Sequence, residues 1–257
     1  MAGMAKIKRS VGRGGVNRAA DVRLIQRLLN HYKIPGVTVL LDVDGVAGPK
    51  TYKRIELFQK KIVRMAHPDG RIDPHGRTFK KLTATRPGAK SAKLFNVSTK
   101  ARNLLKSIEV LKTKPYDDQT GRDIHHWVKG ATIGYGHLIP RREWNKYKSG
   151  ITRAQAVALF NKDLLPFSKK VKQSVTTKIK QNEFDALVIL TFNIGRTAFG
   201  KSSVLKLINN PCANTSYPSL EKAWKAWNKS QGRYNRGLAN RRVAEWNVYS
   251  KNIYKRW

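Results

Sequence analysis

The 257-residue sequence contains a single cysteine, Cys212, and nowhere a run of 18 consecutive apolar residues. One cysteine cannot build an intramolecular disulfide framework or a multi-cysteine zinc site, so packing must stabilise the fold. The lack of a long apolar run argues against a membrane-spanning helix. The basic, glycine-rich segment from Met1 to Gly15 also lacks the apolar run of a secretory signal. We therefore expect synthesis in the cytoplasm without a signal peptide.

Acidic residues are scarce as well, because 16 Asp and Glu stand against 52 Lys and Arg, giving a formal charge of +36. This excess predicts a polyanionic partner, but charge alone does not distinguish nucleic acid, lipopolysaccharide, anionic lipid and the carboxylates of peptidoglycan. Residues 1–90 carry 20 basic and 6 acidic residues, and the rest carries 32 and 10, so the charge is not a detachable tail. Since no zinc knuckle, ribonucleoprotein motif or recognition-helix signature is present, we expect no specific nucleic-acid binding.

The first third of the chain has the pattern of a small helical domain that ends at a polar linker. Apolar residues recur at helical spacing at Val22, Ile25, Leu28, Leu29 and Tyr32, and again at Tyr52, Ile55, Phe58 and Ile62. The stretch from Ala84 to Ala92 is small and polar, contains Pro and Gly, and has no apolar periodicity. We expect a domain over residues 1–84, a linker over residues 85–97 and a second domain over residues 98–257.

An internal repeat lies within this first domain, where Asp44-Gly45 and Asp69-Gly70 are each followed by Pro and then Thr. We interpret both Asp-Gly pairs as turns, because the segment around Asp44 lacks the spacing and the closing Glu of a calcium loop. Together with Asp21-Val22-x-x-Ile25-Gln26 and Phe58-Gln59, the repeat makes the segment from Val11 to Leu82 resemble the three-helix peptidoglycan-binding module. The resemblance implies a non-catalytic anchor to the cell wall.

The second domain begins at the cap-like pair Ser98-Thr99 and is predicted to be mainly helical with a small β-sheet. Leu104, Leu105, Ile108 and Leu111 share one helical face, and Pro115 is predicted to end that helix. Residues 116–137 change to a pattern typical of a hairpin or a three-stranded sheet. A capping box at Thr152 and Gln155 predicts the start of one further helix, and the apolar run from Phe184 to Ile194, which stops at Gly195, predicts another. Apolar residues at three- and four-residue steps predict helices near the end of the chain, and we assign these residues to the core: Trp224, Trp227, Val243, Trp246 and Ile253.

Two kinds of carboxylate stand close together at the start of this domain. Glu109 lies at the edge of the apolar helix face, where partial burial favours the protonated acid, and Asp117 and Asp118 follow in a polar turn. Acid-catalysed cleavage of a glycosidic bond needs such a pair. Taken alone, however, these residues are more typical of a surface salt bridge and a turn cap.

The segment from Thr132 to Leu138, Thr-Ile-Gly-Tyr-Gly-His-Leu, follows these acids in order. With the later motifs around Phe184 to Gly195 and Arg236 to Glu245, it makes residues 98–257 resemble the phage lysozyme (muramidase) family. The resemblance implies an α+β lysozyme-like domain in which Glu109 is the general acid, Asp118 orients or activates water, and Thr132 positions that water. It favours an inverting enzyme, with the two carboxyl groups about 6.5–9.5 Å apart and Asp117 turned away to cap the turn.

Two features depart from the family pattern. Thirteen residues separate Asp118 from Thr132, so the inserted residues 123–127 are expected to loop out near the cleft, and Asp117 stays open as the alternative to Asp118. Val110 stands where the family usually has Gly after the acid. The insertion contains an adjacent His125-His126 pair, but such a pair alone is a poor metal site, so we expect no metal and no cofactor. His137 is expected to brace the sheet through a buried hydrogen bond.

With the wall-binding module in front, the whole chain resembles a modular phage endolysin. The resemblance implies hydrolysis of the β-1,4 bond between N-acetylmuramic acid and N-acetylglucosamine in peptidoglycan, and hence host cell lysis. The alternatives are a lytic transglycosylase that uses Glu109 alone and forms 1,6-anhydro ends, and a basic non-catalytic protein that binds wall or nucleic acid. We expect a monomer, made in the host cytoplasm, that reaches the peptidoglycan through a separate holin-like protein and can engage lipopolysaccharide or the outer-membrane surface.

Overall fold

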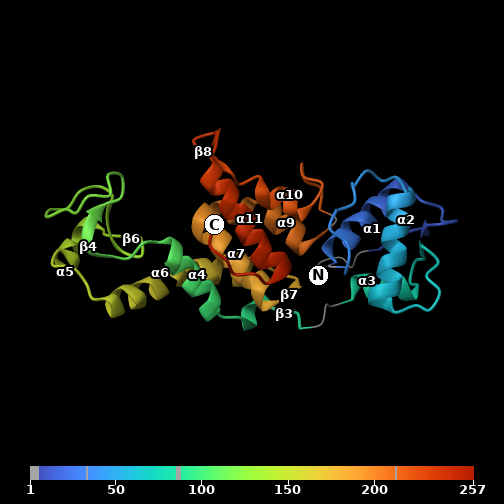
Figure 1. Cartoon of the computed structure of the whole chain (residues 1–257), viewed down its shortest axis with the longest axis horizontal. Coiled ribbons are helices and arrows are strands. Elements are labelled where there is room, and N and C mark those ends of the chain that lie inside the picture. Colours follow the sequence, from blue (N-terminus) through green and yellow to red (C-terminus); the bar gives the residue numbers. More distant parts are fainter. Residues whose placement is uncertain (1–5, 33, 85–87, 212) are drawn as a thin grey trace. The chain divides into compact units, whose positions relative to one another are not determined.

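The computed structural model describes residues 6–32, 34–84, 88–211 and 213–257, and it has the predicted fold, mainly helical with small β-sheets (Figure 1). Cys212 lies outside the described residues. The backbone divides into two compact units. The first contains the described residues up to Ala92, with Ser174–Lys180 and Phe199–Arg242, and the second contains Lys93–Gln173, Gln181–Ala198 and Val243–Trp257. No helix of the described ranges is long and apolar enough to cross a membrane.

Three helices form the N-terminal part of the first unit: α1 (Ala19–His31), α2 (Pro49–Phe58) and α3 (Arg77–Thr83). The two helices predicted from apolar spacing are confirmed, and α2 continues into a π-helical turn at Gln59–Val63. The apolar faces of these helices pack together because their residues recur every three or four positions. The fully buried members of this core include Val22, Ile25, Leu29, Ile55, Phe58 and Ile72. The core draws on residues between 7 and 82, while the domain boundary at residue 84 stays a prediction.

A short antiparallel sheet joins the start of the chain to the second Asp-Gly repeat. Strand β1 (Val11–Gly12) pairs with β2 (Arg71–Ile72), with Gly12 opposite Arg71. Gly12 has a φ of +117°, and a Cβ built on it would lie only 2.0 Å from the carbonyl oxygen of Gly70. Only glycine fits at this position, because any side chain would collide with backbone that cannot move aside.

The first Asp-Gly pair is a turn held by a buried amide side chain. The Gln26 amide nitrogen donates to the Asp44 carboxylate at 2.8 Å, to the Val46 carbonyl at 3.1 Å and to the Thr51 hydroxyl at 3.3 Å. Its amide oxygen accepts from the Gly45 backbone N–H at 3.1 Å. Gly45 has a φ of +86°, which confirms the turn interpretation. We call these five residues the Gln26 cluster.

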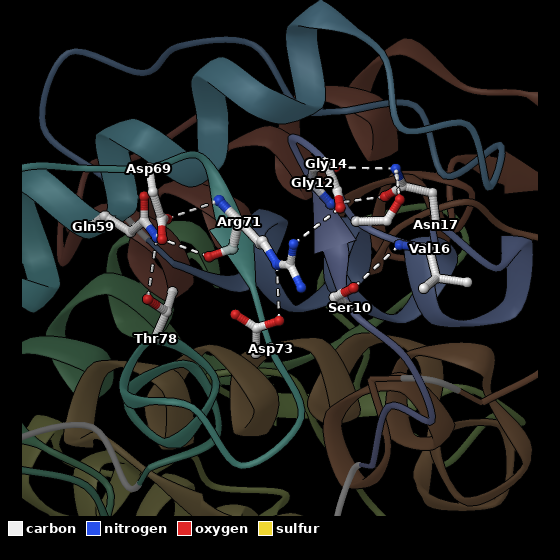
Figure 2. A network of polar contacts seen from close by, with 11 residues as sticks. Ser10, Gly12, Gly14, Val16, Asn17, Gln59, Asp69, Arg71, Asp73 and Thr78 are labelled. Atoms are coloured by element: carbon white, nitrogen blue, oxygen red, sulfur yellow. Dashed lines mark hydrogen bonds and ion pairs between the residues drawn. The ribbon is translucent and has the colours of Figure 1, made fainter.

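The second Asp-Gly pair repeats this arrangement contact by contact (Figure 2). The Gln59 amide nitrogen donates to the Asp69 carboxylate, to the Arg71 carbonyl at 2.9 Å and to the Thr78 hydroxyl at 3.3 Å. Its oxygen accepts from the Gly70 backbone N–H at 2.9 Å. We call these residues the Gln59 cluster. The sequence repeat therefore encodes a repeated polar network. In each copy, a glutamine from the preceding helix makes the hydrogen bonds that hold the turn.

The rest of the first unit consists of short elements. Strand β3 (Lys90–Ser91), which lies within the predicted linker, pairs antiparallel with β7 (Lys178–Ile179). Residues 85–87 of the predicted linker lie outside the described ranges. The remaining elements are helices α9 (Ser203–Asn209) and α10 (Leu220–Lys225), and the hairpin of β8 (Lys229–Ser230) and β9 (Arg233–Tyr234). The chain passes between the two units within a 3-10 turn at Ala92–Leu94 and within helix α8 (Arg196–Lys201).

The second unit contains a three-stranded antiparallel sheet and the longer helices. The sheet has the order β4-β5-β6, from β4 (Lys112–Asp117), β5 (Ala131–Gly134) and β6 (His137–Leu138). Helix α6 leads from the sheet toward the other helices of this unit (Figure 1). The helices are α4 (Thr99–Ile108), α5 (Trp144–Tyr147), α6 (Arg153–Ser174) and α7 (Gln181–Ile194), with a 3-10 turn at Arg141–Glu143. Helix α11 (Arg236–Lys251) begins in the first unit and continues in the second from Val243.

Local signals in this region are confirmed. The Ser98 hydroxyl caps α4 by accepting from the Ala101 backbone N–H at 3.1 Å. Thr152 and Gln155 form the expected capping box, with reciprocal bonds of 2.7 and 3.2 Å. α7 is buried nearly all round and stops before Gly195, whose φ is +87°. These features depend on a few neighbouring residues, which explains why the sequence alone predicts them.

Two other predictions are wrong. Helix α4 ends at Ile108 and not at Pro115, which lies in the edge strand β4. Proline is tolerated in an edge strand, where it does not interrupt hydrogen bonding between two central strands. The core assignment holds for Trp224, but Val243 is 45% exposed and Ile253 is 40% exposed. α11 turns a different face inward, with Ala244, Val248 and Tyr249 buried.

Candidate active site

Glu109 stands at the point where α4 gives way to the sheet. Its backbone N–H still donates to the Leu105 carbonyl at 3.0 Å, but its ψ of 98° takes the chain out of the helix. The side chain is half-buried, and a Cβ built on Gly136 would lie 3.6 Å from Glu109 Oε2. The carboxylate therefore lies in van der Waals reach of the tight turn between β5 and β6.

The two aspartates at the end of β4 have different surroundings. Asp117 accepts from the Gln119 backbone N–H at 3.0 Å and from the Thr120 hydroxyl at 2.9 Å, so it caps the turn as expected. Asp118 is exposed, and its backbone N–H donates to the Gly130 carbonyl at 3.1 Å. Its position is thus fixed through the main chain, while its side chain lies at the surface.

Thr132 is buried in the central strand β5, and its hydroxyl donates to the same Gly130 carbonyl at 2.9 Å. The sequence led us to expect a free hydroxyl, but the proton of this group is already engaged. The oxygen of a threonine hydroxyl keeps acceptor capacity, so it can still receive a hydrogen bond from a water molecule. One carbonyl thus fixes both Asp118 and Thr132.

Tyr116 is a further residue of this site, and the sequence analysis did not single it out. It stands directly opposite Thr132 in the β4-β5 ladder, so the two side chains share one face of the sheet. Burial raises the pKa of the Tyr116 hydroxyl, and the nearby charges of Asp118 and Glu109 raise it further. The charges of both carboxylates thus act on the pKa of one phenol. We call Glu109, Tyr116, Asp118 and Thr132 the Tyr116 cluster.

The inserted residues 123–127 do not loop out freely. The Ile124 backbone N–H donates to the Pro115 carbonyl at 3.0 Å, which extends the pairing of β4. The Trp127 indole N–H donates to the Ile139 carbonyl at 2.9 Å, and the ring packs with Ile124 against a small core that includes Ile133. The insertion therefore folds back onto the sheet, because two of its side chains are large and apolar. His125 and His126 remain exposed at its tip.

His137 braces the sheet as expected. Its Nδ1 lies 2.8 Å from Asp163 Oδ2, which ties β6 to α6. The ring also packs edge-on against Tyr147. Within the described ranges, no group of three or more His, Cys, Asp and Glu side chains is arranged to hold a metal ion.

Comparisons with known proteins show to which family this region is similar. The family model for phage lysozyme matches residues 106–245. An endolysin of Bacillus phage PZA is 33% identical over 165 residues, which cover 63% of this chain but only 57% of that relative. An endolysin of Acyrthosiphon pisum secondary endosymbiont phage 1 is 31% identical over 157 residues, covering 59% of this chain and 95% of the relative.

A solved structure has the same fold over the same region. The endolysin from Escherichia coli O157:H7 phage FAHEc1 is 28% identical, has a TM-score of 0.50, and is matched over 63% of this chain and 98% of its own length. The family model covers more than half of the chain, including Glu109, Asp118 and Thr132. The chain belongs to the phage lysozyme family.

Proposed function

We propose that the protein is an endolysin that hydrolyses the β-1,4 bond between N-acetylmuramic acid and N-acetylglucosamine in bacterial peptidoglycan and so lyses the host cell. The observation that carries this proposal is the match of residues 106–245 to the phage lysozyme family, a range that contains the half-buried Glu109 and the exposed Asp118. Glycosidases need one carboxylic acid in an apolar setting and one carboxylate in a wetter setting. We assign the first role to the half-buried Glu109 and the second to the exposed Asp118.

In the proposed reaction, Glu109 donates its proton to the glycosidic oxygen as the bond to the sugar breaks. A water molecule attacks the anomeric carbon from the opposite face. It donates one hydrogen bond to the Thr132 hydroxyl oxygen and one to the Asp118 carboxylate, which leaves a lone pair directed at the sugar. Asp118 accepts the proton as the new bond forms. This arrangement inverts the configuration, so the first product is the α-anomer.

Product analysis tests the proposal. Purified peptidoglycan digested by the wild type should release fragments with reducing N-acetylmuramic acid ends, and mass spectrometry should show the added water. Proton NMR early in the reaction should show the α-anomer first. 1,6-Anhydro ends would identify a lytic transglycosylase instead. Absence of any cleavage, with binding to walls or nucleic acid retained, would support the non-catalytic alternative.

The three-helix part of the first unit fits the proposed role of a wall anchor, because it has its own core and the repeat of the peptidoglycan-binding module. The charge of +36 would hold the enzyme on an anionic wall or a lipopolysaccharide surface. We further infer a monomer, made in the host cytoplasm, that depends on a separate membrane-permeabilising protein. Co-expression with and without such a protein, followed by a lysis assay, tests that dependence.

A further inference from the structure

The two Asp-Gly repeats have the same internal network but differ in what lies beside them. In the second repeat, β1 covers the segment Arg71–Ile72. The Arg13 backbone N–H donates to the Gly70 carbonyl at 3.0 Å, and the Arg71 guanidinium donates to the Gly14 carbonyl at 2.9 Å (Figure 2). An extended stretch of the protein's own chain therefore occupies this side of the second turn.

The counterpart in the first repeat is open. Val46 and Ala47 correspond to Arg71 and Ile72, yet no strand among the described residues pairs with them. A hollow of about 350 Å³ lies here, lined by Asp42, Asp44, Val46, Gly48, Lys50 and Thr51, among others. A Cβ built on Gly48 meets no atom within 4 Å, so this glycine faces open space and not packed backbone.

The charges of this hollow are unusual for so basic a protein. Asp42 and Asp44 are two of only six acidic residues in the first 90, and Lys50 stands beside them at the start of α2. Hydrogen bonds from the Val46 backbone N–H and then from Gln26, helped by the charge of Lys50, hold the pKa of Asp44 below its ordinary value. The hollow thus presents both signs of charge at neutral pH. The carboxylates of Asp42 and Asp44 disfavour phosphate polyanions, and the nearby Lys50 ammonium favours a carboxylate partner.

We propose that this hollow binds an extended peptide bearing a free ammonium and a free carboxylate, the chemistry of a diamino acid in the stem peptide of peptidoglycan. The inference rests on the proposed wall-anchoring function. The aspartates receive the ammonium, while the Lys50 ammonium receives the carboxylate. The peptide backbone lies beside Val46 and Ala47, as β1 lies beside their counterparts.

Titration of the full chain with a synthetic tripeptide tests the site. The probe is L-alanyl-γ-D-glutamyl-meso-diaminopimelate, and the comparison peptide carries L-lysine in the third place, which has the ammonium but not the second carboxylate. Calorimetry should show tighter binding of the first peptide. In NMR spectra the backbone amides of Val46 and Gly48 should shift, and those of β4 and β5 should not. Shifts confined to the Tyr116 cluster, or no binding, would overturn the proposal.

Variants with a matched control sharpen the result. Asp42→Asn and Lys50→Gln should each weaken tripeptide binding about fivefold, as expected for loss of one exposed ion pair. Lys53→Gln changes the same charge one turn along α2, is exposed and does not line the hollow, so binding should be unchanged. Gly48→Trp should fill the hollow and abolish binding, with thermal unfolding as the check on folding. Equal weakening by Lys50→Gln and Lys53→Gln would mean that only net charge matters.

The outcome for this site is separable from that for the enzyme. Wall lysis and tripeptide binding by the wild type are measured with the same protein preparation. Lysis without tripeptide binding rejects the proposed peptide site and leaves the hydrolase intact. Tripeptide binding without lysis supports the site and rejects the hydrolase. Asp42→Asn and Lys50→Gln should still release products from soluble glycan at the wild-type rate, because neither residue belongs to the Tyr116 cluster.

Discussion

The Gln59 cluster and the Tyr116 cluster are both networks of polar side chains, but they differ in how far they are open to solvent. Gln59 is fully buried, and its amide bonds only to the protein's own turn and helix. In the Tyr116 cluster, Asp118 is exposed and Glu109 is half-buried, and their charges disfavour ionisation of a neighbouring phenol. A saturated network fixes a backbone, whereas a charged network open to solvent is suited to act on a substrate.

The strongest test of this contrast is Glu109→Gln. The amide keeps the shape of the side chain but cannot donate the proton, so wall lysis should fall by about 10²–10⁴-fold. The thermal unfolding of both units should stay within about 0.5 kcal/mol of wild type, since the residue is not part of a packed core. Turbidity assays measure the loss of lysis, and calorimetric melting measures the stability. Lysis above a tenth of the wild-type rate would remove Glu109 from the role of acid.

The two neighbouring aspartates should separate activity from turn stability. Asp118→Asn should lower lysis on the order of 10²-fold, because the amide cannot take the proton of the attacking water. Asp117→Asn should retain most of the activity and cost about 1 kcal/mol through weaker capping of the turn. Initial rates on soluble glycan and urea unfolding measure these effects. The reverse pattern would assign the water-activating role to Asp117.

Replacing the buried amide of Gln59 should lower stability and leave activity unchanged, which is the opposite of the effect expected at Glu109. Gln59→Met removes the partners of Gly70, Asp69 and Thr78 and should destabilise the three-helix part by about 2–3 kcal/mol. Hydrogen exchange of the α1 and α2 amides should accelerate, while the rate on soluble glycan stays unchanged. Gln173→Met is the control, because Gln173 is exposed. Unaltered exchange in Gln59→Met would show that the network contributes little to stability.

A smaller effect is expected at Tyr116 itself. Burial and then the charges of Asp118 and Glu109 raise the pKa of its hydroxyl, so Asp118→Asn should lower that pKa. Carbon-13 NMR of the tyrosine rings across alkaline pH follows the change, with Tyr116→Phe assigning the signal. Asp163→Asn should leave the titration where it is, since Asp163 is not among the charges that act on this ring. An unmoved Tyr116 titration in Asp118→Asn would place the two groups too far apart to share a substrate.

The smallest effect concerns acid stability of the first repeat. The pKa of Asp44 is lowered from its ordinary value of 3.8, so its contribution to stability is present above that value and is lost as pH falls through the lowered pKa. The free energy of unfolding of the three-helix part should therefore fall below about pH 4. In Asp44→Asn this free energy should depend less steeply on pH. Because the side chain is exposed, high salt should shrink the difference. Identical pH profiles for the two proteins would contradict this linkage.

The sequence predicted the local features of the site but not its assembly. Ser98 and the capping box at Thr152 follow from residues three positions apart, and Asp117 was correctly expected to cap its turn. The position of Tyr116 depends on which residue of β5 stands opposite it, and that register is set by the whole sheet. The packing of Trp127 was missed for the same reason, since its partners are separated from it along the chain. The separation between Glu109 and Asp118 stays a prediction.

The carbonyl of Gly130 accepts from both Asp118 and Thr132, so the two ends of the long insertion are closed by a single atom. Between them, His125-His126 forms the exposed tip of a bend, and the residues on either side are held, Ile124 by the Pro115 carbonyl and Trp127 by the Ile139 carbonyl. Exposed loop tips anchored at both ends are the places where a chain tolerates added sequence. The tip is therefore a point at which a peptide tag or a second binding segment can be inserted at the edge of the candidate active site. Such an insertion should leave the distance between Asp118 and Thr132 unchanged.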